Sequence, residues 1–366
     1  MLEGIRIIEV EGLGAAPFAG MLLADLGADV IVVHRPTSSP GELTTEQSVI
    51  DRGKRSIVLN LKQADDLHIF KQLLGTADAL IEGFRPGVME RLGIGPSDCF
   101  KLNKKLVYGR MTGWGQHGEQ SQTAGHDLNF IAMSGAAWYS SASGNPPQPP
   151  PTLVGDSGGG ALYLVVGVLS ALIKARQTGT GCTVDAAIVD GSAHLMNLLM
   201  SLRQAGVMQT ERGQSVLDGP HFSRTYETAD AGYMSVQCIE PAFYAVFLGK
   251  LGLATDQAFL DQYNKSLWPD LTHRLSAVFL SKTRKEWEAV FANSDACVAP
   301  VLNPEEAFDH PYNKVRETWI KPQGLLQARA APRFSTEDHW QPSPGPKRDQ
   351  HRQDILEELK INNKET

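Results

Sequence analysis

The sequence predicts an α/β protein whose larger domain is built on a parallel sheet. Two short β-branched runs, at 5–10 and 30–33, enclose a segment at 18–26 whose apolar residues recur at helical spacing. A strand, a helix and a strand in this order form a βαβ unit, whose two strands run parallel in one sheet. The same alternation continues to Tyr108, so several such units follow one another.

The remaining elements extend this pattern and then change it. Strands are expected at 56–59, 79–81, 106–108 and 183–189, and helices at 65–74, 87–92, 161–175 and 194–205. From Tyr226 the character differs, because 232–238 alternates like an antiparallel strand while 243–251 and 285–291 are amphipathic. We therefore predict a Rossmann-like large domain at 1–190, completed by 320–366, a linker helix at 191–222 and a small α+β domain at 223–319. A proline-rich arm at 331–346 and a charged helix at 350–359 complete the chain.

Composition excludes several classes of protein. The 366 residues carry 34 Lys and Arg against 41 Asp and Glu, a net charge of −7, which disfavours nucleic acid and membrane surfaces as partners. The longest apolar stretch, 161–173, is shorter than the roughly 20 residues that cross a bilayer as a helix. The four cysteines are scattered, and the start of the chain lacks a targeting pattern, so a cytoplasmic location is expected.

The common sequence motifs for nucleotide binding, serine hydrolysis and zinc binding are absent or incomplete. Gly12 and Gly14 resemble the start of a dinucleotide fingerprint, but Pro17 replaces its third glycine and no acidic residue ends the second strand. The sequence has no P-loop, no G-x-S-x-G elbow and no H-E-x-x-H. We therefore expect neither a bound cofactor nor a metal.

Two sets of side chains are candidates for chemistry. The segment 51–62 carries four basic groups and one acidic group, a net charge of +3, which suits a pyrophosphate but also fits a solvated rim. One expected helix start carries His126 and Asp127 directly after Gly125, and another carries Asp156 beside several glycines. The free backbone N–H groups at a helix start favour a developing oxyanion. Both aspartates also fit simple N-caps, and Glu240 also fits a surface carboxylate.

At these residues the chain resembles the class III CoA-transferase (CaiB/BaiF-like) family over nearly its whole length. Within the family it is similar to the members that epimerise 2-methylacyl-CoA thioesters. The resemblance rests on LEGIR at 2–6, LADLGA at 23–28, DRGKRS at 51–56, FRPGVMERLG at 84–93, TGWGQ at 112–116, AGHD at 124–127, IEPAFY at 239–244 and DACVAPV at 295–301.

The resemblance implies a racemase that moves a proton at the carbon α to a thioester. Inverting that carbon requires two acid/base groups on opposite faces of a planar enolate, and the matching residues are His126 and Asp156. Glu240 would orient the His126 ring, and the backbone N–H of Asp127 would stabilise the enolate oxygen.

Binding residues and assembly are implied in the same way. The positions that match the family's CoA site are Arg52, Leu59, Lys62, Arg85 and Arg91, and CoA is then part of the acyl-CoA substrate. The resemblance also implies an interlocked homodimer, in which Glu240 acts either in its own chain or in the partner's site. Bile-acid, branched fatty-acid and aryl-propionyl thioesters all stay open as substrates.

Two other functions are compatible with the resemblance. A transferase would use Asp127 as its carboxylate nucleophile, but such members generally lack the preceding His126 and carry a glycine-rich loop where this chain has Glu240. A catalytically inactive acyl-CoA-binding paralogue would be expected to lack His126, Asp156 or Glu240, and all three are present.

Overall fold

The computed structural model describes residues 1–36, 48–336 and 341–362, which form two compact units. The large unit consists of Met1–Ala137, Pro149–Leu195 and Ile320–Thr366, and the small unit consists of Trp138–Gln148 and Met196–Trp319. The small unit therefore takes in a loop from the first half of the chain that the sequence did not assign to it. The expected linker helix at 191–222 is instead two short helices, with only turns and bends over 205–222.

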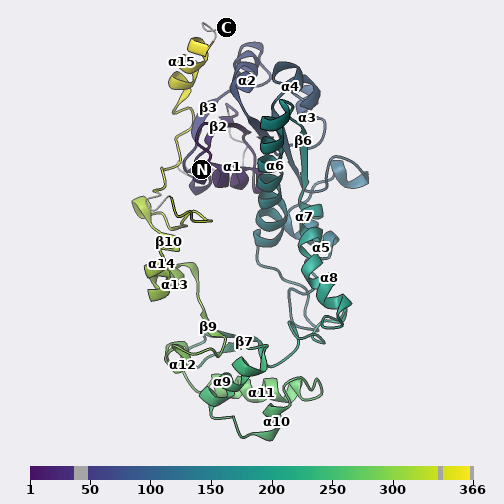
Figure 1. Ribbon diagram of the computed structural model, residues 1–366, viewed down its shortest axis with the longest axis vertical. Helices are drawn as coiled ribbons and strands as arrows, with labels where there is room; N and C mark the ends of the chain where they lie inside the picture. Colours follow the sequence, from purple (N-terminus) through teal and green to yellow (C-terminus); the bar gives the residue numbers. More distant parts are fainter. Residues whose placement is uncertain (37–47, 337–340, 363–366) are drawn as a thin grey trace. The chain divides into compact units, whose positions relative to one another are not determined.

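The large unit is built on a six-stranded sheet in which every neighbouring pair is parallel (Figure 1). The strand order is β3-β2-β1-β4-β5-β6, the order of the doubly wound nucleotide-binding fold. The predicted α/β class and parallel sheet are confirmed. The strands are β1 (Arg6–Val10), β2 (Asp29–His34), β3 (Arg55–Val58), β4 (Ala79–Glu82), β5 (Val107–Thr112) and β6 (Thr183–Ala187).

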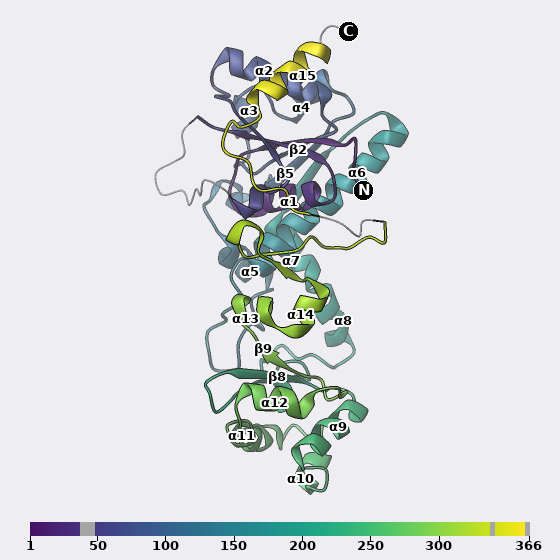
Figure 2. The same ribbon diagram turned by 90° about the vertical axis from the view of Figure 1, so that its left-hand side faces the viewer.

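Helices cover both faces of this sheet. Successive residues of a strand point to opposite faces, so neighbouring residues pack against different helices. Ile7 packs against helices α1 and α6 on one face, whereas Ile8 packs against α2, α3, α4 and α15 on the other (Figure 2). Both faces are thus buried, which explains the continuous apolar strands. The helices are α1 (Ala15–Asp25), α2 (Ala64–Thr76), α3 (Val88–Arg91), α4 (Pro96–Leu102), α5 (Asp127–Ser134), α6 (Leu162–Thr178), α7 (Ile188–Leu195) and α15 (Arg352–Asn362).

The strand order reverses between β1 and β4, and the loops that follow these two strands lie close together. A Cβ added to Gly83, after β4, would lie 3.3 Å from the Cβ of Ala16 at the start of α1. In open parallel sheets, ligands bind at this switch point, outside the carboxyl ends of the strands. The topology therefore places the expected binding region at the loops after β1 and β4.

The helix expected at 161–175 begins earlier than the sequence indicated. A π-helix spans Leu153–Ala161 and runs directly into α6, so the helical segment is continuous from Leu153 to Thr178. Asp156 therefore lies within the first turn of a helix, where a polar turn before the helix was expected. By length and composition this segment could cross a membrane, unlike the shorter apolar stretch counted in the sequence, but half of its apolar window is buried inside the protein.

The small unit contains an antiparallel sheet in the order β7-β8-β9 and an aromatic core. Its strands are β7 (Ser223–Glu227), β8 (Tyr233–Gln237) and β9 (Val298–Val301). Phe279 stacks on Tyr226 and contacts Trp287 and Phe291. The helices are α8 (Asn197–Gln204), α9 (Pro241–Leu251), α10 (Gln257–Leu260), α11 (Trp268–Phe279), α12 (Arg284–Phe291), α13 (Pro304–Asp309) and α14 (Pro311–Arg316).

The end of the chain packs on the large unit. It carries the two-residue strands β10 (Trp319–Ile320) and β11 (Gln327–Ala328) before it reaches α15. Ile355 and Leu359 are buried against the α2 side of the sheet, and Glu358 forms ion pairs with Arg6 and Arg55. Residues more than 290 positions apart thus share one core.

Replacing Ile355 with Ala should lower the free energy of unfolding by about 2–5 kcal/mol, because its side chain is fully buried in the core of the large unit. Urea denaturation measures the change, and Glu357→Ala, two residues further along α15 on its exposed face, is the matched control. Equal stabilities for the two variants would mean that α15 does not pack on the sheet.

Stability of the small unit should depend on His221. This fully buried ring contacts the Tyr244 hydroxyl through Nε2 at 2.7 Å, while its Nδ1 has no hydrogen-bond partner among the described residues. Burial, and then the charge of Arg224, lower the pKa of His221 to about 4.

Because the folded state disfavours the protonated ring, its stabilising contribution is complete above pH 6.5 and is lost as the pH falls toward 4. The loss should be on the order of 3 kcal/mol. Urea denaturation should therefore show that the free energy of unfolding falls more between pH 7 and pH 4.5 for the natural chain than for His221→Gln. Equal decreases in the two proteins would contradict the role of His221.

Candidate active site

His126 and Asp127 occupy the start of helix α5, as their position after Gly125 predicted. His126 is the N-cap residue in extended backbone geometry, and its N–H donates to the Asn129 side chain at 3.1 Å. The His126 side chain is exposed, whereas Asp127, the first helical residue, is buried. The turn therefore presents the imidazole outward and keeps the neighbouring carboxylate inside.

The Asp127 carboxylate joins this turn to the π-helix that carries Asp156. Its Oδ1 accepts a hydrogen bond from the backbone N–H of Asp156 at 2.7 Å. The approach requires glycine at 155, because a Cβ there would lie 2.4 Å from the same oxygen. The structure thus brings together three of the four predicted catalytic residues, although 29 positions separate the two aspartates.

Close helix packing holds the π-helix in place. A Cβ on Gly159 would lie 2.3 Å from Ser192 Oγ, and one on Gly191 would lie 1.8 Å from the Gly159 carbonyl oxygen. Only glycines allow α7 and the π-helix to approach this closely. The glycine run at 158–160 therefore serves helix packing as well as access to the backbone.

Burial and the two neighbouring side chains change the pKa of Asp156. Burial raises the pKa of Asp156 above its ordinary value, the charge of Asp127 raises it further, and His126 lowers it. A carboxyl group that holds its proton more tightly is better matched to proton transfer near neutral pH than a fully solvated aspartate. Asp156 therefore has the electrostatic setting of an acid/base group.

His126 lines a cavity of about 290 Å³ at the carboxyl ends of β4 and β5. The Phe130 ring fills the space beside Gly113 and Gly125, where a Cβ would lie 2.0 Å and 2.6 Å from it, and Trp114 packs edge-on against that ring. Arg85 also lines the cavity. Gly83 and Phe84 also line the cavity, so it borders the loop after β4, one of the two loops at the switch point of the sheet.

An ion network that the sequence did not reveal, with buried Glu82 and Arg110 and exposed Glu90, holds the loop carrying Arg85. Glu82 accepts a hydrogen bond from the Phe84 N–H at 2.7 Å and another from Arg110 at 3.1 Å, and Arg110 also pairs with Glu90. Burial raises the pKa of Glu82 to about 7 against the opposing effect of Arg110. Because the three residues lie on separate elements, their spacing in the sequence carried no signal.

Asp156 lines a second cavity, of about 390 Å³, which does not include His126. Its walls come from the start of α1, the 3₁₀ turn η1 (Val49–Asp51) and the segment at 327–328. The two predicted acid/base groups therefore face different cavities of the large unit.

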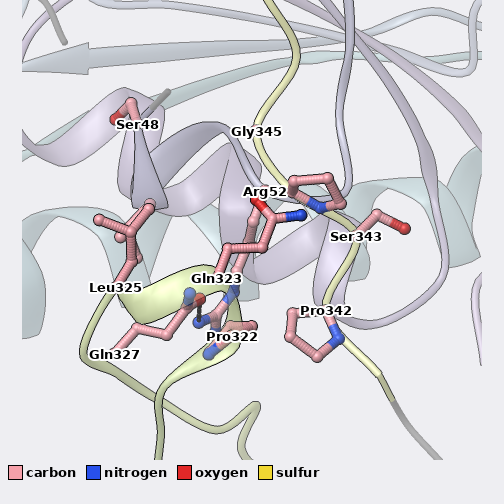
Figure 3. A pocket seen from close by; sticks show the side chains of 11 residues that line it. Ser48, Arg52, Pro322, Gln323, Leu325, Gln327, Pro342, Ser343 and Gly345 are labelled. Atoms are coloured by element: carbon pink, nitrogen blue, oxygen red, sulfur yellow. Dashed lines mark hydrogen bonds between the residues drawn. The ribbon is translucent and has the colours of Figure 1, made fainter. Parts of the chain in front are cut away.

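The predicted CoA-binding positions differ in what they offer. The Arg52 guanidinium is buried and binds Asp25, Gln327 and the Ala328 carbonyl, next to a cavity of only about 30 Å³ (Figure 3). Arg52 thus has a structural role, and its phosphate contact stays a prediction. The Leu59 side chain lies in the core, which leaves only its backbone for a ligand, whereas Lys62, Arg85 and Arg91 are exposed.

Glu240 belongs to the small unit. It is the exposed N-cap of α9, directly before Pro241. The preceding carbonyl, of Ile239, accepts hydrogen bonds from Gln262 at 2.9 Å and Tyr263 at 2.7 Å, so the backbone leading to Glu240 is fixed. Its predicted contact with His126 stays a prediction. Among the described residues, no group of three or more His, Cys, Asp or Glu side chains could hold a metal ion.

A histidine and two carboxylates lie at the carboxyl edge of a parallel sheet, beside cavities of ligand size, and such groups are suited to acid–base chemistry. The chain belongs to CoA-transferase family III, whose family model matches residues 2–352. It is 39% identical to the α-methylacyl-CoA racemase of Mus musculus over 337 residues, which are 92% of this chain and 87% of the mouse protein.

Two further comparisons agree. The α-methylacyl-CoA racemase of Homo sapiens is 38% identical over 375 residues, covering 100% of this chain and 94% of the human protein. The crystal structure of a CaiB/BaiF family protein from Brucella suis superposes with a TM-score of 0.83 at 26% identity, covering 98% of both chains. The family expected from the sequence is confirmed.

Replacing Asp156 with Asn should stabilise the fold at neutral pH. The raised pKa of Asp156 means that the folded state disfavours its ionised form, so ionisation costs stability above the folded pKa. The gain in melting temperature should shrink as the pH falls through that pKa toward 3.8. Thermal denaturation across this range measures it, with Asp309→Asn, an exposed carboxylate, as the control. A gain that does not change with pH would exclude a charge effect.

Proposed function

We propose that the protein epimerises 2-methylacyl-CoA thioesters by removing and returning the proton at the α-carbon. The observation that carries the proposal is the hydrogen bond from the Asp156 N–H to Asp127, because it joins the helix start that carries His126 to the helix start that carries Asp156. The similarity to two α-methylacyl-CoA racemases supports the same reaction.

Each group has a role that its chemistry fits. His126 removes the α-proton from one face of the substrate while Asp156, in its protonated form, supplies a proton to the other, and the reverse reaction exchanges these roles. The intermediate is an enolate, whose oxygen needs a donor. The backbone N–H of Asp127 lies in the first turn of α5, where helical N–H groups have no intrahelical acceptor, and so it is suited to this charge.

The Asp127 side chain favours the racemase over a CoA transferase that uses it as a nucleophile. A nucleophilic carboxylate must reach the thioester carbon, whereas that of Asp127 is buried and accepts the Asp156 N–H. Its contacts suit a part in holding the Asp156 segment.

Glu240 and the dimer complete the proposal. We propose that Glu240 hydrogen-bonds the His126 ring, either within one chain or in the partner's site of an interlocked homodimer. The helical segment Leu153–Thr178 exposes Leu162, Val166 and Ile173 along one side. Contiguous exposed apolar side chains of this kind are typical of interaction surfaces. A second copy of the chain would cover it. A cytoplasmic location is part of the same proposal.

The reaction can be followed by isotope exchange. Incubating a single epimer of a 2-methylacyl-CoA in deuterated water should give α-deuterium incorporation and epimerisation without any acceptor acid. Transfer of CoA to an added carboxylate, with no label at the α-carbon, would instead establish a transferase.

Two substitutions separate the mechanisms. His126→Ala should lower epimerisation by at least 10²–10⁴-fold, as expected for loss of an acid/base group. Asp127→Asn keeps an oxygen that accepts the Asp156 N–H but removes the nucleophilic carboxylate. A racemase should therefore lose less than tenfold of its activity, whereas a transferase should lose nearly all of its activity. The opposite order of effects would reject the racemase mechanism. Glu240→Gln should fall between the two.

A further inference from the structure

Lys54 carries a buried ammonium group that no step of the proposed reaction uses. Its side chain is fully buried, and its Nζ donates hydrogen bonds to Glu9 at 3.0 Å, to the Pro17 carbonyl oxygen at 3.1 Å and to Asp51 at 3.2 Å. An ammonium group has three N–H donors, so these three acceptors satisfy it. The acceptors belong to β1, α1 and η1. One charged group therefore joins three segments of the large unit.

The interior is shaped to hold this ammonium group and its main counter-ion. A Cβ on Gly20 would lie 1.9 Å from Glu9 Oε2 and 3.3 Å from Lys54 Cε, so α1 has a glycine where the ion pair passes. An apolar pair of similar size would fill the same space with little loss of stability, because taking two charges out of water costs about as much as their attraction returns. The ions add direction, since their hydrogen bonds fix where α1 and η1 lie relative to β1.

Both elements that Lys54 holds border the Asp156 carboxyl group. Gly14 precedes α1, and a Cβ there would lie 3.2 Å from Asp156 Oδ2, so the carboxyl group lies against the start of this helix. Ala15 packs against the π-helix, since a Cβ on Gly160 would lie 3.1 Å from the Cβ of Ala15. Residues of α1 and η1 line the cavity of Asp156, whereas within the described part of the chain neither element lines the cavity at the ends of β4 and β5.

We propose that Lys54 is a positioning residue for Asp156, because it holds α1 and η1 where they keep the carboxyl group aligned for proton transfer. This inference rests on the proposed epimerase function. The rate of proton transfer depends on alignment, and a displacement of about 1 Å can cost on the order of 10²-fold. The effect of losing Lys54 should be confined to the face of the substrate that Asp156 serves, since His126 lies on α5 and lines the other cavity.

Exchange measured separately for the two epimers distinguishes positioning from a general loss of structure. With two bases, each epimer presents its α-proton to one of them, so loss of that base stops exchange from one epimer while exchange from the other continues. Asp156→Asn therefore identifies the epimer that Asp156 deprotonates, and His126→Ala should show the opposite pattern. Both rates come from α-deuterium incorporation in deuterated water, starting from each pure 2-methylacyl-CoA epimer.

The main variant combines Glu9→Gln with Lys54→Met in the full-length protein, which removes both buried charges and leaves neither unpaired. Exchange from the epimer assigned to Asp156 should fall about tenfold or more, whereas exchange from the other epimer should change less than about twofold. Asp51→Ala removes only the partly exposed acceptor on η1 and should give a smaller loss with the same asymmetry. If the double variant does not fold, Asp51→Ala decides the question by the same criterion.

Arg55→Met is the matched control. Arg55 follows Lys54 in the chain, and its partners, Asp29 and Glu358, are not among the described residues that line the Asp156 cavity. This variant should leave the ratio of the two exchange rates unchanged. Equal losses from both epimers in the Lys54 variant, or no loss from either, would overturn the proposal, because Lys54 would then support only the fold. Failure of the proposed function would differ, since the natural chain would then exchange neither epimer.

Discussion

One hydrogen bond, from the Asp156 backbone N–H to the buried Asp127 carboxylate, fixes the geometry of the candidate site. It joins the start of α5 to the first turn of the π-helix, the two segments that carry His126 and Asp156, the proposed acid/base groups. The bond is possible only because Gly155 has no side chain, and the π-helix can lie there only because Gly159 and Gly191 let α7 approach. The chemistry of the site therefore depends on backbone packing as much as on the reactive side chains.

The sheet explains why this site lies where it does. Its strand order reverses between β1 and β4, and the loops after these strands border the two cavities, Gly14 on the Asp156 side and Gly83 on the His126 side. The exposed Arg85 lines the cavity of His126, whereas the cavity of Asp156 is lined by apolar residues of α1 together with Arg52, whose guanidinium is held by Asp25 and Gln327. The two cavities at the carboxyl edge of the sheet therefore suit a molecule with one charged end and one apolar end.

Buried charged residues elsewhere in the large unit stabilise the fold by joining separate segments. Arg52 joins α1 to the late segment at 327–328, Arg110 holds the loop of Arg85, and Lys54 pairs with Glu9 inside the unit. In a buried environment such ions must be paired, because an unpaired charge is strongly disfavoured. The basic segment at 51–62 therefore divides into buried residues that secure the fold and exposed ones, such as Lys62, that are available to a ligand.

Hydrophobic periodicity along the chain was enough to predict the parallel α/β class, and motifs such as AGHD at 124–127 were enough to indicate the family and to single out His126, Asp127 and Asp156. Tertiary structure decided what depends on distant residues meeting. The π-helix around Asp156 follows from packing against α5 and α7, the partners of Arg52 come from the far end of the chain, and the Glu82 network joins separate elements. Helix ends such as those at Leu153 and Met196 also escaped the sequence, since an apolar run shows the same period whether the helix continues or breaks.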